Sequence, residues 1–112
     1  MSYSLLYVTL GSYKDAMALA RTLVEERLVA CANVIDGTKS VYRWDGETKE
    51  ESESIMVAKT EDRLMTQAID RVVELHSYEC PCAISLPITE GHKPFLDWIS
   101  DEVTAITASS AR

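Results

Sequence analysis

The chain has 112 residues and a mass of 12.5 kDa, which is enough for a single domain over residues 1–112 with a hydrophobic core of its own. Its 18 acidic residues outnumber its 11 basic residues, and without a block of lysine or arginine it offers no surface for a nucleic acid. No apolar run is long enough to cross a bilayer, and the stretch Met1–Tyr3 lacks the features of a signal peptide. Together with an odd number of cysteines, these features predict a soluble, cytoplasmic protein without membrane contact.

The first part of the sequence predicts a strand followed by a helix. Ser4–Leu10 is largely apolar and has the pattern of a buried strand. Ser12, with Asp15 three residues later, has the form of a capping box at a helix start. Apolar residues then recur at three- and four-residue steps and predict the core face of the helix: Met17, Ala20, Val24 and Leu28.

The middle of the chain predicts antiparallel strands joined by turns. Strand patterns cover Ala30–Ile35, Ser40–Trp44 and Glu51–Thr60. Asp36-Gly37 and Asp45-Gly46 separate them, and Asp-Gly between apolar runs is a strong hairpin signal. The last of these strands begins with charged residues and ends in an apolar run. We therefore expect its first half to be exposed or covered by another subunit and its second half to lie in the core.

The C-terminal part predicts a helix, a strand and a further helix. The helical period runs from Asp62 to His76, and Pro81 prevents its continuation. Ala83–Leu86 has a strand pattern, and an amphipathic helix follows Pro94. The order strand, helix, strand, strand, helix, strand, with an added helix, predicts an α+β protein with the ferredoxin-like split β-α-β arrangement, in which the helices cover one face of an antiparallel sheet.

Aromatic residues on the third predicted strand suggest that this protein associates with itself. Tyr42 and Trp44 share one side of the strand, whereas Val41 lies on the other. Apolar groups on both sides indicate that an uncovered face or edge of the sheet is buried by something else, and a second copy of the chain is the simplest candidate. Tyr42, Trp44 and Tyr78 could form such an interface or, alternatively, a cage for a ligand.

The segment His76–Cys82 contains the candidate metal ligands. Cys80 and Cys82 are two positions apart, so in an extended segment both thiols would point to one side and could bind Cu(I) or Zn(II). Two thiols do not complete a zinc site, and buried, inert cysteines are the alternative. His76 at the end of a helix is likewise either a ligand or a residue favoured by the helix dipole. Cys31 is expected to pack in the core.

Several segments, spread in order over nearly the whole chain, resemble the CutA divalent-cation tolerance family: Glu26–Ile35, Ser40–Gly46, Ala58–Thr60, Glu74–Pro81, Leu86–Ile88 and Leu96–Ile99. The resemblance implies a ferredoxin-like subunit that forms a tight homotrimer, with long hairpins wrapping neighbouring subunits, and a link to tolerance of copper and other divalent cations. It also makes His76 a candidate for the copper association of the family. The chain departs from the family pattern at Ser77, where proline is usual, and at Cys82, where glutamate is common.

From these observations we predict a cytosolic homotrimer that is linked to copper tolerance through metal binding or a metal response. No enzymatic activity and no required cofactor are expected, although copper or another divalent cation could bind. The predicted metal ligands are His76, Cys80 and Cys82. The predicted subunit interface contains Tyr42, Trp44 and Tyr78. The alternative is a PII-like signalling or scaffold trimer for a small ligand, which would need an anion-binding loop rich in glycine, lysine or arginine that the sequence lacks.

Overall fold

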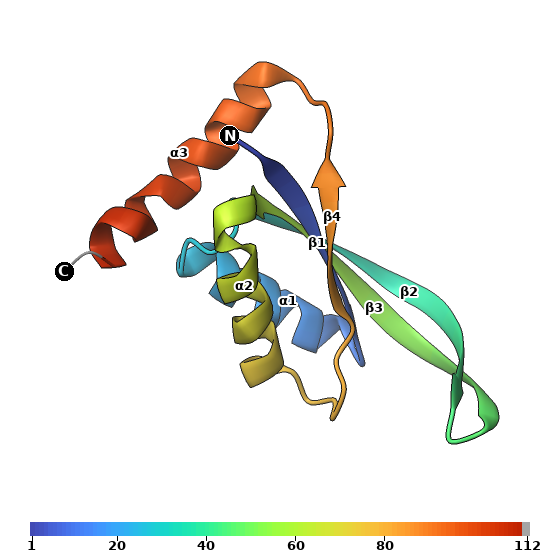
Figure 1. Ribbon diagram of the computed structural model, residues 1–112. Coiled ribbons are helices and arrows are strands. Elements are labelled where there is room, and N and C mark those ends of the chain that lie inside the picture. Colours follow the sequence, from blue (N-terminus) through green and yellow to red (C-terminus); the bar gives the residue numbers. More distant parts are fainter. Residues whose placement is uncertain (111–112) are drawn as a thin grey trace.

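The computed structural model describes residues 1–110, with the side chains of residues 1–103. Within this range the four strands form one antiparallel sheet in the order β2-β3-β1-β4 (Figure 1). The elements along the chain are β1 (Tyr3–Leu10), α1 (Tyr13–Glu25), β2 (Cys31–Trp44), β3 (Glu47–Glu61), α2 (Asp62–Leu75), β4 (Ala83–Ile88) and α3 (Lys93–Ser110). This order and strand arrangement confirm the predicted split β-α-β topology with an added C-terminal helix. In the described part of the chain, no helix is both long and apolar enough to cross a membrane.

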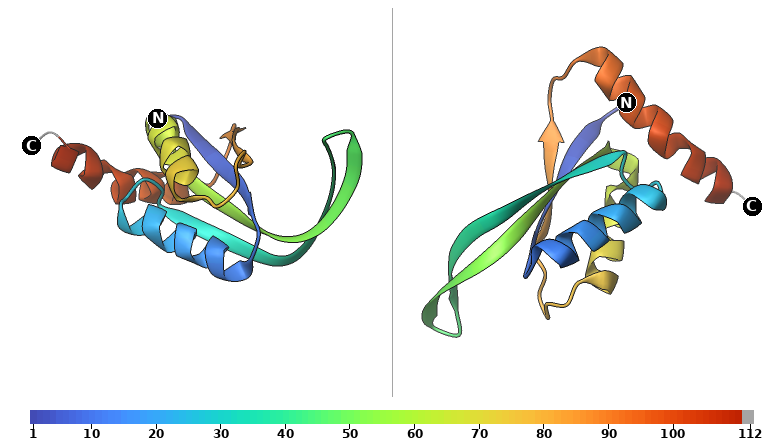
Figure 2. Two further views of the ribbon diagram at one scale, coloured as in Figure 1. Left: turned by 90° about the horizontal axis from the view of Figure 1, so that it is seen from below. Right: turned by 180° about the vertical axis from the view of Figure 1, so that it is seen from behind.

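The core lies between one face of the sheet and helices α1 and α2, which cover that face (Figures 1 and 2). Alternate residues of β1 are buried, as expected for a strand with one face toward helices. The helix α3 instead packs across the end of the sheet, where the hydroxyls of Tyr3 and Ser100 are 2.8 Å apart. The same end holds Glu61, which is 1% exposed and accepts a hydrogen bond from Ser100.

The predicted start of α1 is confirmed, but its predicted core face is partly wrong. The hydroxyl of Ser12 accepts a hydrogen bond from the backbone N–H of Asp15 at 3.1 Å. The residues of α1 that are buried are Ala16, Leu19, Ala20 and Leu23. Val24 is 38% exposed, because it lies beside the face that these residues form, and Leu28 reaches the core from the turn after the helix, which ends at Glu25. Counting Leu28 as part of the helical period therefore rotated the predicted face.

The two Asp-Gly pairs have different structures, and only one of them is a hairpin turn. Asp45-Gly46 reverses the chain between β2 and β3, with positive φ at both residues. Asp36-Gly37 lies within β2, so the two predicted strands on either side of it are one strand. The pairing there moves from Ile35↔Ile55 to Thr38↔Glu53. Two residues of β2 therefore lie opposite one residue of β3, which defines a β-bulge.

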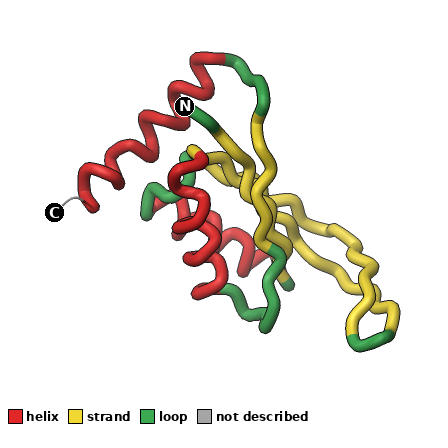
Figure 3. The backbone as a smooth tube through the Cα atoms, in the orientation of Figure 1, coloured by secondary structure: helices red, strands yellow, loops and turns green. Residues whose placement is uncertain are grey.

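The hairpin of β2 and β3 extends beyond both covering helices, and its far end bends away from the rest of the chain (Figures 2 and 3). The first six residues of β3, from Glu47 to Ser52, are exposed, and alternate residues further along the strand are buried. This pattern confirms the prediction that β3 has an exposed first half and a core-forming second half. The projecting hairpin places strand side chains outside the helix-covered core.

The face of the sheet opposite α1 and α2, which we call the open face, is apolar along β1 and β4, whereas β2 and β3 place Asn33 and Lys59 on it. The register places Leu5 beside Leu86 and Tyr7 beside Ile84, and Leu86 and Ile84 are 42% and 51% exposed. Cys31 also lies on this face, since it alternates with Ala32, which packs against the core. The prediction that Cys31 packs in the core was therefore wrong. A single chain leaves an apolar surface of this kind uncovered.

Candidate functional site

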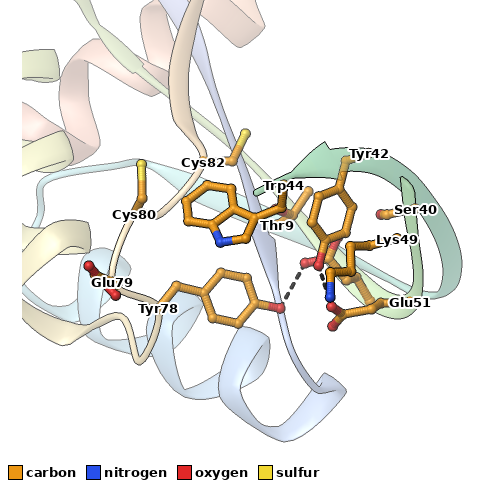
Figure 4. A pocket seen from close by; sticks show the side chains of 11 residues that line it. Thr9, Ser40, Tyr42, Trp44, Lys49, Glu51, Tyr78, Glu79, Cys80 and Cys82 are labelled. Carbon is orange, nitrogen blue, oxygen red and sulfur yellow. Dashed lines mark hydrogen bonds between the residues drawn. The ribbon is translucent and has the colours of Figure 1, made fainter. Parts of the chain in front are cut away.

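A cavity of about 580 Å³ lies between the projecting hairpin and the loop that connects α2 to β4. Its volume is in the range of pockets that bind small molecules. Figure 4 shows the side chains that line it, which come from β1, from both strands of the hairpin and from the loop. The lining residues are Thr9, Ser40, Tyr42, Trp44, Lys49, Glu51, Glu53, Tyr78, Glu79, Cys80 and Cys82.

Strand alternation and the hairpin register bring aromatic and acidic side chains to the same side of the hairpin. Tyr42 and Trp44 are two positions apart on β2 and so project to one side. Tyr42 lies opposite Lys49 in the register, and Ser40 lies opposite Glu51. The Tyr42 hydroxyl donates a hydrogen bond to Oε1 of Glu51, which is a diagonal contact across the two strands. This hydrogen bond raises the pKa of Tyr42, so its hydroxyl stays protonated.

Tyr78 closes the cavity from the loop side. Its hydroxyl donates a hydrogen bond to Oε2 of Glu53 at 2.7 Å. Burial, reinforced by this hydrogen bond, raises the pKa of Tyr78 well above its usual range. The ring approaches the end of β1 closely: a Cβ atom at Gly11 would lie 3.3 Å from the Tyr78 hydroxyl oxygen. Glycine at this position therefore leaves the space that the tyrosine occupies.

His76 links the end of α2 to β1 through both of its ring nitrogens. Nε2 lies 2.7 Å from the carbonyl oxygen of Thr9, and the backbone N–H of Tyr78 donates to Nδ1 at 3.1 Å. The two contacts fit one neutral tautomer, in which Nε2 carries the proton and donates to Thr9. The ring also packs on that of Tyr78, with centroids 4.6 Å apart. To bind a metal, His76 would have to release one of these two hydrogen bonds.

Cys80 and Cys82 both line the hairpin cavity, as Figure 4 shows. Both are free thiols; Cys80 is exposed and Cys82 is half-buried. His76 lines a separate cavity of about 200 Å³, between α1 and the end of α2. Within the described residues no group of three or more His, Cys, Asp or Glu side chains is arranged to hold a metal ion. The structure thus brings the two cysteines to one cavity, and the set of His76, Cys80 and Cys82 stays a prediction.

Two of the acidic residues of the cavity, Glu51 and Glu53, were not recognised from the sequence. Glu51 and Glu53 lie in the charged first half of β3 and have the composition of a solvated strand. The signal that could have found them is the turn at Asp45-Gly46, because counting back from a two-residue turn pairs Tyr42 with Lys49 and Ser40 with Glu51. This pairing places the carboxylates beside the aromatic rings.

The sheet order, the helix-covered face and the projecting hairpin with its cavity define a small α+β protein of the split β-α-β class. The model of the family described as CutA1 divalent ion tolerance protein matches residues 4–102. The chain belongs to this family, as its sequence resemblance predicted.

Relatives and solved structures agree with this assignment. The divalent-cation tolerance protein CutA of Thermus thermophilus is 40% identical over 94 residues, covering 84% of this chain and 91% of that protein. Protein CutA of Homo sapiens is 37% identical over 96% of this chain, which spans only 60% of the human protein. The crystal structure of CutA from Xylella fastidiosa superposes with a TM-score of 0.89 at 33% identity, covering 92% of this chain and 99% of that chain. A structure described as the periplasmic divalent cation tolerance protein CutA from Archaeoglobus fulgidus gives a TM-score of 0.88 at 36% identity, covering 90% of this chain and 98% of that chain.

Proposed function

We propose that this protein acts as a cytosolic homotrimer in tolerance of copper and other divalent cations, without enzymatic activity, and that it binds Cu(I) through Cys80 and Cys82. The observation that carries the proposal is that both thiols, separated by one residue, line the same cavity. Thiolates are soft donors and select Cu(I) over hard cations such as magnesium. The family name of the relatives supports a role in cation tolerance. A reducing cytoplasm would keep both cysteines available as ligands.

The proposed trimer follows from the open face of the sheet. Leu86 and Ile84 on β4 and Ile35 on β2 are each more than two-fifths exposed in the single chain. Burying such side chains contributes about 25 cal/mol for each Å² of apolar surface removed from water. Two further copies of the chain would cover this face and the aromatic side of the hairpin, where the proposed contacts of Tyr42, Trp44 and Tyr78 would lie. A neighbouring subunit could also supply the ligands that two thiols leave missing.

The acidic lining of the cavity disfavours the alternative of a PII-like trimer for an anionic ligand. Glu51, Glu53 and Glu79 contribute three carboxylates, against the single ammonium group of Lys49. A phosphate-bearing ligand would be repelled by this arrangement.

Copper binding and assembly test the proposal separately. The full chain is titrated anaerobically with Cu(I) in competition with a chromogenic chelator, and the C80S/C82S double variant is compared with C31S. We expect the double variant to lose the bound copper and C31S to retain it, because Cys31 lies on the open face outside the cavity. Native mass spectrometry should show three chains per particle. Unchanged copper stoichiometry in the double variant would refute the metal site, and a stable monomer would refute the trimer.

A further inference from the structure

The strand β3 carries opposite charges at the two ends of one side. Alternate residues of a strand point the same way, and Met56 and Ala58 point into the core. The residues that alternate with them therefore lie on the open face and its extension along the hairpin: Glu51, Glu53, Ile55, Val57 and Lys59. Two carboxylates stand at the hairpin end, and one ammonium group stands at the other. At about 3.3 Å for each residue, Glu53 and Lys59 are roughly 20 Å apart, too far to pair within one chain.

Lys59 has no counter-charge in the single chain. Its ammonium group donates a hydrogen bond to the neutral amide oxygen of Asn33. Among the described residues, no carboxylate forms an ion pair with it. The register places it between Leu5 and Cys31, and Lys59 is already half-buried. When another subunit covers this face, the ammonium group loses more of its water, and the burial of an unpaired charge is strongly unfavourable. A covering chain is therefore expected to supply a carboxylate at this point.

The hairpin has the opposite imbalance. Glu51 and Glu53 each accept a hydrogen bond from a tyrosine hydroxyl on one carboxylate oxygen, which leaves the second oxygen for a further donor. A hydroxyl does not balance the charge of a carboxylate. Lys49 is the basic residue of the lining, but its ammonium group lies 3.8 Å from Glu47 at the hairpin turn. The carboxylates on this wall of the cavity, where Figure 4 shows Glu51, therefore favour a cation from outside the chain.

We propose that Lys59 of each chain pairs with Glu51 and Glu53 of a neighbouring copy, so that the projecting hairpin of one subunit lies on the open face of the next. The hairpin extends beyond the helices of its own chain, as Figure 2 shows, and can therefore reach a neighbour. A free anion would balance only Lys59 and a free cation only the carboxylates, whereas this contact balances both.

The pairing is directional, because its two partners lie at opposite ends of one strand. Each copy offers an ammonium group to one neighbour and carboxylates to another, and a closed ring leaves neither end unpaired. Ile55 and Val57, which lie between the two ends, contribute apolar contact area. The pairing rests on the proposed trimer, because it requires a neighbouring copy, but a trimer could form without it.

Cross-linking of the unsubstituted full chain tests the pairing. A water-soluble carbodiimide joins the ammonium group and the carboxylate of an ion pair as an amide, with loss of water and without a spacer. We expect covalent dimers and trimers of the chain on a denaturing gel. Mass spectrometry of their peptides should show Lys59 linked to Glu51 or Glu53. A link within one chain would leave the mass of a monomer. Native mass spectrometry of the same preparation gives the number of chains per particle.

Charge reversal supplies a second test with a matched control. Lys59→Glu should weaken association by about 30-fold or more, because like charges would meet at the contact. Adding Glu51→Lys should restore part of this loss. Adding Glu50→Lys instead should restore nothing, since Glu50 is the next residue along β3 and points to the opposite side. Sedimentation equilibrium measures association, and circular dichroism shows whether each variant is folded. The cross-linking needs no variant, so a variant that fails to fold leaves the pairing testable.

The outcomes distinguish the pairing from the proposed trimer. A stable monomer would refute both. A trimer whose cross-links join other residues, or that keeps its full affinity in Lys59→Glu, would refute the pairing and leave the trimer standing. Equal rescue by Glu50→Lys and Glu51→Lys would show that the net charge of the chain controls association, and it would also overturn the pairing.

Discussion

Replacing His76 by alanine is the sharpest test of how the candidate site is built. The substitution removes the hydrogen bonds to the Thr9 carbonyl and from the Tyr78 amide, and the ring contact with Tyr78. Each hydrogen bond contributes about 1 kcal/mol and the aromatic contact about 0.5–1.5 kcal/mol, so the sum is about 3 kcal/mol. Because His76 is only half-buried, water can replace part of this loss. We therefore expect the free energy of unfolding to fall by about 2 kcal/mol.

The assay is urea unfolding followed by circular dichroism, at one fixed protein concentration because the proposed trimer couples folding to assembly. His92→Ala is the matched control: His92 is exposed, and its backbone carbonyl, which alanine keeps, accepts hydrogen bonds from the N–H groups of Phe95 and Leu96 at the start of α3. This control should change stability by less than about 0.5 kcal/mol. If the His76→Ala variant is as stable as the parent protein but no longer binds copper, the anchoring role is refuted and the predicted ligand role is supported.

Three other substitutions test the fold and the assembly. Glu61→Ala should lower the free energy of unfolding by about 2–4 kcal/mol in urea titrations, because it removes a buried carboxylate that joins α2 and α3 to the sheet; unchanged stability would contradict that role. The hydrogen bond from Arg71 lowers the pKa of Glu26, so this carboxylate contributes stability above its unfolded pKa near 4.5 and loses it as the pH falls through the lower folded value. A Glu26→Gln variant should accordingly be less stable than the parent at neutral pH, and the difference in the free energy of unfolding should shrink in acid. A difference that stays constant across this pH range would argue against a stabilising role for the hydrogen bond between Arg71 and Glu26. Leu86→Arg on the open face should produce smaller particles in analytical ultracentrifugation, whereas Val73→Arg, at a position that is also exposed but lies on α2, should not; trimers in both variants would exclude the open face as the interface.

The two Asp-Gly pairs show what the sequence could and could not predict. At both sites glycine permits a positive φ, and the structure has one there. A local signal of this kind fixes the backbone conformation but not whether the chain reverses. At Gly37 the chain continues, because residues on both sides of it pair with the same strand, β3. Only this long-range pairing distinguishes a bulge from a turn.

The candidate site was predictable to the extent that its residues are chemically rare. Cys80, Cys82 and Trp44 stand out in any sequence, and the structure brings them to one cavity. Glu51 and Glu53 are two of many acidic residues, and nothing local distinguishes them from a solvated strand. Their position beside the rings depends on the hairpin register, which is a tertiary property. Sequence composition therefore identifies unusual residues better than it identifies their partners.

The open face and the hairpin cavity differ in the kind of occupant that each can take. On the open face, Leu5, Leu86 and Ile84 supply apolar surface, and Lys59, which the register places beside Leu5, donates a hydrogen bond to Asn33. An apolar protein surface can cover the part of this face on β1 and β4 without burying a carboxylate. In the cavity, Glu51 and Glu53 would each lose hydration if an apolar surface filled it, and uncompensated burial of a carboxylate costs several kcal/mol. A cation avoids this cost by balancing the charge. The chemistry of the two surfaces therefore favours apolar contacts on the open face and positively charged groups at the cavity.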